Sequence, residues 1–140
     1  MHLKRRFEEW MFSIPEPNRS TAGIVLWWEL RRVPYNLIVG TTGLVSLSLV
    51  YFFSGRTNAI EPEEDVVEPI ALLLAPVAMD VCYTAGWAVE AFLYRSYCEG
   101  ENVLGPDLLR FGLRFSLFLV TLPAMFWAGY WILQVAGIVK

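Results

Sequence analysis

The sequence has 140 residues, of which 56% are hydrophobic, and a net charge of −3. Soluble domains contain about 45–50% apolar residues, so the excess predicts a membrane protein and excludes a pair of soluble domains. The single histidine, His2, and the two cysteines offer no spacing for a metal site and no Ser/His/Asp or Cys/His set. A phosphate-binding glycine loop is also missing. We therefore expect no catalytic residue, no metal, no cofactor and no nucleic-acid partner.

Residues 1–32 predict an amphipathic segment at the membrane surface. Their basic start is followed by acids and prolines instead of the apolar run of a signal peptide. One amphipathic helix is expected at 4–12 and a second, capped by Ser20, at 19–33. The tryptophans and arginines of the second are typical of an interfacial helix. Pro34 then predicts a break before the first membrane span. A docking surface for a cytoplasmic partner is the alternative role of this segment.

Three apolar stretches, at about 33–54, 66–94 and 111–137, follow the N-terminal segment. Each is long enough to cross a bilayer, which takes about 20 mostly apolar residues. The predicted fold is therefore all-α: an integral membrane three-helix bundle over residues 33–140, preceded by an N-terminal amphipathic interfacial helix.

Basic residues are unevenly distributed among the segments that connect the spans. Nine of the eleven Lys and Arg residues fall on one side of the membrane if the N-terminus is inside. The loop between the first two spans, at 55–68, is acidic. Because basic residues mark the cytoplasmic side, we expect a cytoplasmic N-terminus and an outside C-terminus.

The second span carries two contrasting helix faces. One is a stripe of small side chains, and the opposite face is polar and aromatic. Small side chains let helices approach closely in lipid, so this span is predicted to be central, with a neighbour on each face. The small stripe consists of Ala71, Ala75, Ala78, Cys82, Ala85 and Val89. The polar face consists of Asp80, Tyr83, Trp87, Glu90 and Tyr94.

Small residues in the other two spans predict where those helices pack. Asn36, Gly40 and Gly43 share a face of the first span and are expected to meet the small stripe. Ala124 and Ala128 form a small-xxx-small pair in the third span. Together with Ala75, Ala78 and Cys82, these are the candidate helix-packing residues.

Three charged residues inside the spans form a candidate polar site with Tyr83 and Trp87. Glu90 and Arg114 are expected at the same depth near the cytoplasmic edge, where they would form an ion pair. Asp80 lies ten residues from Glu90, about 15 Å along the helix, near the bilayer middle, where no basic residue is expected. A charge there costs about 2.5–3.5 kcal/mol on insertion scales. Asp80 is therefore expected to be protonated or hydrogen-bonded to a hydroxyl.

Two stretches of sequence, WWELRRVPYN at 27–36 and CYTAGWAVE at 82–90, resemble a group of small bacterial integral membrane proteins. The resemblance covers the spans and implies a bacterial cytoplasmic membrane. It carries over no activity.

Three functions compete at this point. The first is a non-enzymatic assembly or accessory subunit that acts through helix packing, with the lipid bilayer and a homo-oligomer or partner membrane protein as partners. The alternative is an oligomeric channel or proton-linked transporter that uses Asp80. The least favoured is a lipid-modifying enzyme that uses Asp80, Tyr83 and Glu90, because no nucleophile or metal set accompanies them.

Overall fold

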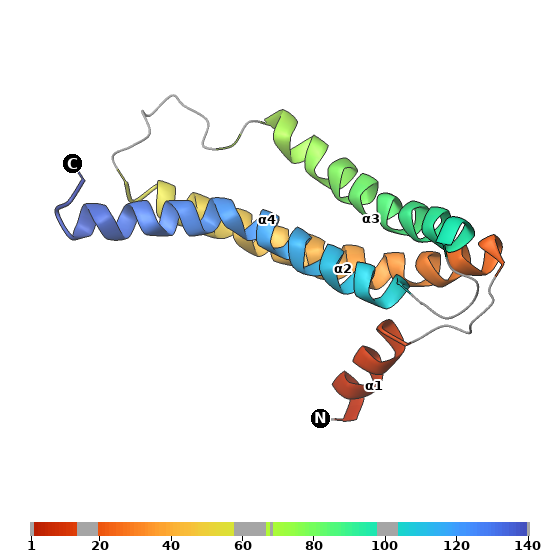
Figure 1. The fold of residues 1–140 in the computed structure, drawn as a ribbon. Helices are drawn as coiled ribbons and strands as arrows, with labels where there is room; N and C mark the ends of the chain where they lie inside the picture. Colours follow the sequence, from red (N-terminus) through yellow and green to blue (C-terminus); the bar gives the residue numbers. More distant parts are fainter. Residues whose placement is uncertain (1, 14–19, 58–66, 68, 98–103, 140) are drawn as a thin grey trace. The chain divides into compact units, whose positions relative to one another are not determined.

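The computed structural model describes residues 2–13, 20–57, 67, 69–97 and 104–139. These residues form four helices: α1 (His2–Met11), α2 (Thr21–Ser54), α3 (Pro69–Tyr97) and α4 (Gly105–Val135) (Figure 1). Three of them are long and apolar enough to cross a membrane, through Thr21–Ser54, Leu72–Leu93 and Gly105–Val135. The all-α prediction and the three long apolar helices are confirmed. The acidic residues at 61–65 and 68, and Cys98, lie outside the described residues.

The helix α2 is continuous through the predicted break. Ser20 caps it as expected, because its Oγ accepts a hydrogen bond from the Gly23 N–H at 3.2 Å. Pro34, however, lies inside the helix, so the prediction of a break there was wrong. A proline removes a single backbone donor. Arg31 and Tyr35, on the two sides of Pro34, are both buried in tertiary contacts that hold the turn in place.

The chain divides into two compact units, and their boundaries pass through the three long helices. Unit 1 consists of Met1–Asn36 and Ala78–Arg114. Unit 2 consists of Leu37–Val77 and Phe115–Lys140. Each unit has its own buried residues.

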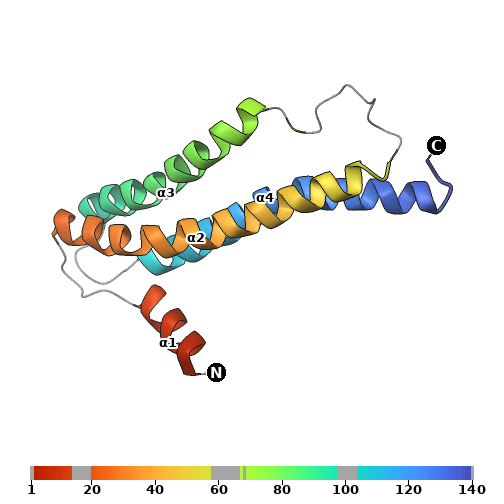
Figure 2. The ribbon, with the colours of Figure 1, turned by 180° about the vertical axis from the view of Figure 1, so that it is seen from behind.

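Unit 1 is built on an antiparallel pair of helix segments. The first part of α2 runs against the second part of α3 (Figure 2). Trp28 accordingly lies near Glu90, while Tyr35 lies near Tyr83. The helix α1 is set across α2 rather than along it (Figures 1 and 2). The buried apolar side chains of unit 1 are Met11, Ile24, Trp27, Trp28, Tyr35, Tyr83 and Leu109.

Unit 2 pairs the second part of α2 with the second part of α4. Phe53 and Trp131 are in contact, with ring centroids 5.6 Å apart, and Val50 and Ala124 are buried. Several hydroxyls of this unit bond within their own helices, as Ser48 does to the Leu44 carbonyl at 2.9 Å. The described α3 side chains from residue 70 to 77 are exposed.

Candidate functional site

One buried polar group of unit 1 is the carboxylate of Glu90, which is 2% exposed. Its Oε2 accepts a hydrogen bond from the indole Nε1–H of Trp28 at 2.5 Å. Its Oε1 accepts one from the backbone N–H of Gly105 at 3.0 Å. Gly105 is the first residue of α4, where backbone donors lack partners within the helix and a negative charge is favoured. Glu90 therefore caps α4 and joins three helices.

The close approach of these helices depends on two glycines. A Cβ on Gly105 would lie 2.8 Å from both Glu90 carboxylate oxygens. A Cβ on Gly86 would lie 2.8 Å from the edge of the Trp28 ring. Real Cβ atoms do not approach other atoms so closely, so both positions require glycine for this arrangement.

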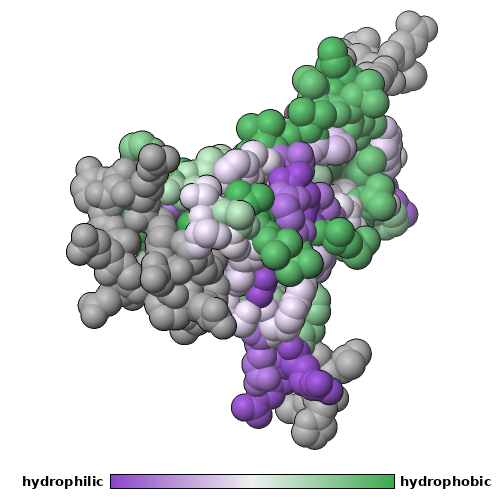
Figure 3. Space-filling view, turned by 90° about the vertical axis from the view of Figure 1, so that its right-hand side faces the viewer, coloured by the Kyte–Doolittle hydropathy of each residue, from purple (hydrophilic) through white to green (hydrophobic). Residues whose placement is uncertain are grey.

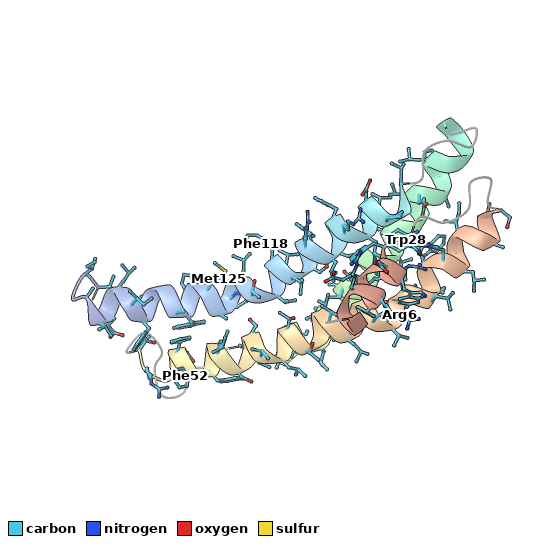
Figure 4. All side chains as sticks on the ribbon, turned by 90° about the horizontal axis from the view of Figure 1, so that it is seen from below. Arg6, Trp28, Phe52, Phe118 and Met125 are labelled. Carbon is cyan, nitrogen blue, oxygen red and sulfur yellow. The ribbon has the colours of Figure 1, made fainter. Side chains whose placement is uncertain are left out.

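Tyr83 contacts both the backbone and the ring of Trp28. The Tyr83 hydroxyl donates a hydrogen bond to the Trp28 carbonyl, and the two rings meet edge to face at 5.3 Å. Tyr83 also packs on Tyr35, with centroids 4.7 Å apart. Figure 4 shows Trp28 where the side chains of α1, α2 and α3 gather. This aromatic group fixes the register of α2 against α3.

A second buried charge, Arg31, fastens α1 to α2. It is 4% exposed, and its guanidinium lies 3.9 Å from the Trp27 ring centroid and 5.0 Å from that of Trp10. Its Nε donates to the Met11 carbonyl and its Nη2 to the Trp10 carbonyl, both at 2.8 Å. These carbonyls are at the C-terminus of α1, where acceptors lack helical partners and a cation is favoured. Arg31 thus caps α1 from a neighbouring helix.

The third charged group is a half-exposed cluster of Arg32, Glu29 and Asp80. The Nη2 atom of Arg32 lies 2.8 Å from the Glu29 carboxylate, and its Nη1 lies 3.5 Å from Asp80 Oδ1. Nη2 also donates to the Thr84 hydroxyl at 3.4 Å. The Asp80 side chain remains 49% exposed. The cluster lies on the surface between α2 and α3 and holds two carboxylates for one guanidinium.

Asp80 therefore has the basic neighbour that the sequence did not predict. The hydroxyl partners expected for Asp80 were Ser46, Ser48 or Thr121 of the other spans; Ser48 and Thr121 bond within their own helices. The predicted first span begins at residue 33, which placed Arg32 outside it, at the membrane edge. The continuous α2 instead pairs its own N-terminal part with α3, and this pairing brings Arg32 to Asp80.

The predicted pairing of Glu90 with Arg114 is also corrected. Glu90 lies beside Gly105, whereas Arg114 follows nine residues later, about 14 Å further along the helix. Arg114 is exposed and forms no ion pair within the described part of the chain. The two residues were expected at the same depth because the third span was predicted to begin at residue 111. The helix α4 begins six residues earlier, at Gly105.

The candidate packing residues separate into two groups. Ala124 is buried and Ala128 is half-buried, as a packing pair requires. The small stripe of α3 is exposed at every position whose side chain the structure describes, namely Ala75, Ala78, Cys82, Ala85 and Val89. Asn36 is exposed, and a Cβ on Gly40 or Gly43 would meet nothing within 4 Å. The predicted contact between these residues and the small stripe is therefore not seen in the described part of the chain.

Three other residues of the site were not anticipated as such. Trp28, Arg31 and Arg32 were interpreted as interfacial residues. The spacing of four between Trp27 and Arg31 was a usable signal, because it places the cation and a ring on the same helix face. Nothing in the sequence indicated that Gly105 would be the partner of Glu90.

The chemistry of the site is that of helix joining. Glu90 and Arg31 direct their polar atoms at helix ends, and Trp87 is half-buried on the same side of α3. Within the described residues, no three His, Cys, Asp or Glu side chains are grouped to hold a metal ion. The chain matches no protein-family model, no curated protein and no solved structure.

Proposed function

We propose that this chain is a polytopic membrane protein that acts as a non-enzymatic assembly or accessory subunit. It works through helix packing in the bilayer and assembles with copies of itself or with a partner membrane protein. In this proposal the three long helices form the membrane bundle, and α1 is an amphipathic helix at the interface.

The observation that carries the proposal is the contrast between the two faces of α3. One face, with Tyr83 and Glu90, is buried in unit 1 by contacts with α2 and α4. The small stripe on the other face is left exposed. In lipid, small side chains favour close helix association through packing. An exposed stripe of this kind on a membrane helix favours a further helix as its neighbour.

The charge distribution supports the proposed orientation in a bacterial cytoplasmic membrane. Of the arginines whose side chains the structure describes, all but Arg56 belong to unit 1. Figure 3 shows hydrophilic side chains on α1, at the bottom of the view, and Phe7 and Trp10 of the same helix are exposed. Basic and aromatic residues together are typical of the cytoplasmic interface, so the N-terminus is assigned to the cytoplasm and the C-terminus to the outside.

The assembly proposal is tested by purifying the tagged full-length chain in a mild detergent and measuring its mass by native mass spectrometry. An oligomer, or a stoichiometric membrane protein that co-purifies, is the expected result. A monomer without a protein partner, in several detergents and in nanodiscs, would overturn the proposal. Alkaline phosphatase fused to the C-terminus tests the orientation, and activity of this fusion is expected.

A proton-linked transporter or channel that uses Asp80 is the second candidate. It is favoured by one observation, the 49% exposure of the Asp80 side chain inside a candidate span. Proton or cation flux into liposomes that contain the wild-type chain, lost in Asp80→Asn, would establish it in place of the assembly role.

A further inference from the structure

Arg114 is an exposed charged residue of α4. Around the axis of α4, Arg114 is on the side opposite to the buried residues Gly105 and Ser116. The same face of α4 carries Asp107 and Arg110, which pair with each other at 3.0 Å, and the exposed aromatic side chains of Phe111 and Phe118. Figure 4 shows Phe118 on the side of α4 that points away from α2. Because Asp107 on this face is paired with Arg110, Arg114 is the charge of this face that has no partner within the described part of the chain.

The cluster of Arg32, Glu29 and Asp80 has an excess of negative charge, opposite in sign to Arg114. Its two carboxylates, Glu29 and Asp80, share one guanidinium, which leaves a net charge of −1. Both acids are nearly half exposed, at 43% and 49%. An uncompensated charge within a membrane span is costly, so the cluster and Arg114 each favour a partner of opposite sign.

The two charges lie at matching levels in unit 1. The contact between Glu90 and Gly105 places these two residues at the same height along the helix axes. From this level Asp80 is ten residues along α3, about 15 Å, and Arg114 is nine residues along α4, about 14 Å. Because α3 and α4 run in opposite directions across the membrane, Asp80 and Arg114 lie on the same side of Glu90 and at nearly the same height.

We propose that Arg114 of one copy of this chain pairs with Asp80 in the Arg32 cluster of a second copy. Closed cyclic symmetry about the membrane normal keeps every copy at the same depth. Two charges can therefore pair between copies only if they lie at the same depth, and Asp80 and Arg114 meet this requirement. The pair adds a cation to a cluster that lacks one and covers the exposed side of both groups. This inference rests on the proposed assembly function and names the contact that would hold the assembly together.

Crosslinking between two differently tagged copies tests the contact. Both copies carry Cys82→Ser and Cys98→Ser; one also carries Asp80→Cys and the other Arg114→Cys. A short bis-maleimide is used, because an Arg–Asp pair holds its Cα atoms further apart than a disulfide permits. The mixed assembly keeps the reciprocal pair, Asp80 of one copy with Arg114 of the other. A crosslinked heterodimer is expected.

The control replaces Asp80→Cys with Phe92→Cys, an exposed α3 position twelve residues away, about 18 Å along the helix. It should give no crosslink. A crosslink of equal yield in this control would overturn the inference. An oligomer that fails to crosslink through 80 and 114 would overturn the inference but leave the assembly function standing. A monomeric wild-type chain would overturn both.

A charge variant gives an independent readout. Arg114→Gln is expected to shift the native mass distribution from oligomer toward monomer. Arg110→Gln is the matched control, since Arg110 is exposed on α4 but pairs with Asp107 of its own helix at 3.0 Å. Equal shifts in the two variants would show that the effect is not specific to Arg114, and would count against the pair. If Arg114 is instead held by lipid phosphate, Arg114→Gln will leave the oligomer intact and change only its dependence on anionic lipid.

Discussion

The two units of this protein are held together by different kinds of contact. In unit 1, polar side chains join residues that are far apart in the sequence, as Glu90 joins Trp28 and Gly105. In unit 2, hydroxyls such as those of Ser48 and Thr121 bond within their own helix, and Phe53 and Trp131 form an apolar contact between helices. Polar contacts between helices are directional and therefore specify one register, whereas apolar contacts tolerate small shifts.

The largest expected effect is in unit 1, at Glu90. Glu90→Ala leaves the Trp28 indole and the first backbone donor of α4 without their acceptor. Because each of the two buried donors left without a partner costs about 1–3 kcal/mol, the variant should lose about 2–6 kcal/mol of stability. Thermal unfolding in detergent, followed by tryptophan fluorescence, measures the loss. Glu90→Gln keeps an acceptor and should lose less; an equal loss would show that the negative charge, rather than the acceptor, matters most.

The next effect concerns the attachment of α1. Arg31→Ala removes the guanidinium that caps α1 and leaves the Met11 carbonyl without this donor, whereas the Trp10 carbonyl keeps Ser13 as a donor. A loss of about 2–3 kcal/mol is expected in the docking of α1, with little effect on the rest of the chain. Hydrogen exchange of residues 2–11 should rise sharply. Arg31→Lys should not restore protection, since an ammonium lacks the planar fork; restored protection would mean that charge alone holds α1.

A smaller and purely steric effect is expected at Gly86. Gly86→Ala places a methyl group 2.8 Å from the edge of the buried Trp28 ring, and overpacking of this kind costs about 1–3 kcal/mol. Gly112→Ala is the matched control in unit 1, because a Cβ there meets nothing within 4 Å. It should be neutral or stabilising by up to about 1 kcal/mol, since alanine is the better helix former. Similar melting temperatures for the two variants would contradict the packing of Trp28 on α3.

The smallest effect is expected in unit 2. Ser48→Ala removes an exposed hydroxyl that bonds only the Leu44 carbonyl of its own helix. Changes at such surface positions usually stay within about 0.5 kcal/mol. A loss comparable to that of Glu90→Ala, in the same unfolding assay, would mean that the two units do not differ in the way described above.

Much of the fold followed from composition and pattern. The apolar stretches predicted three long helices, and Ser20 predicted the start of α2. These features depend on local chemistry, because helix length, caps and hydropathy are set by residues close together in the sequence. The buried Ala124 also agrees with its small-xxx-small pattern.

The partners of the charged residues were decided only by the tertiary structure. The sequence identified Asp80, Glu90 and Arg114 as the charges inside the spans, but it paired Glu90 with Arg114 and left Asp80 without the basic neighbour that it has. Which charges meet depends on the register between helices, and a shift of nine or ten residues moves a side chain about 14–15 Å along the helix. Here the register is set by contacts between distant residues, through the close fit of Trp28 against Gly86 and of Glu90 against Gly105. No spacing within a single helix encodes such contacts, and for this reason the sequence determined the helices and their charges while the packing determined the pairs.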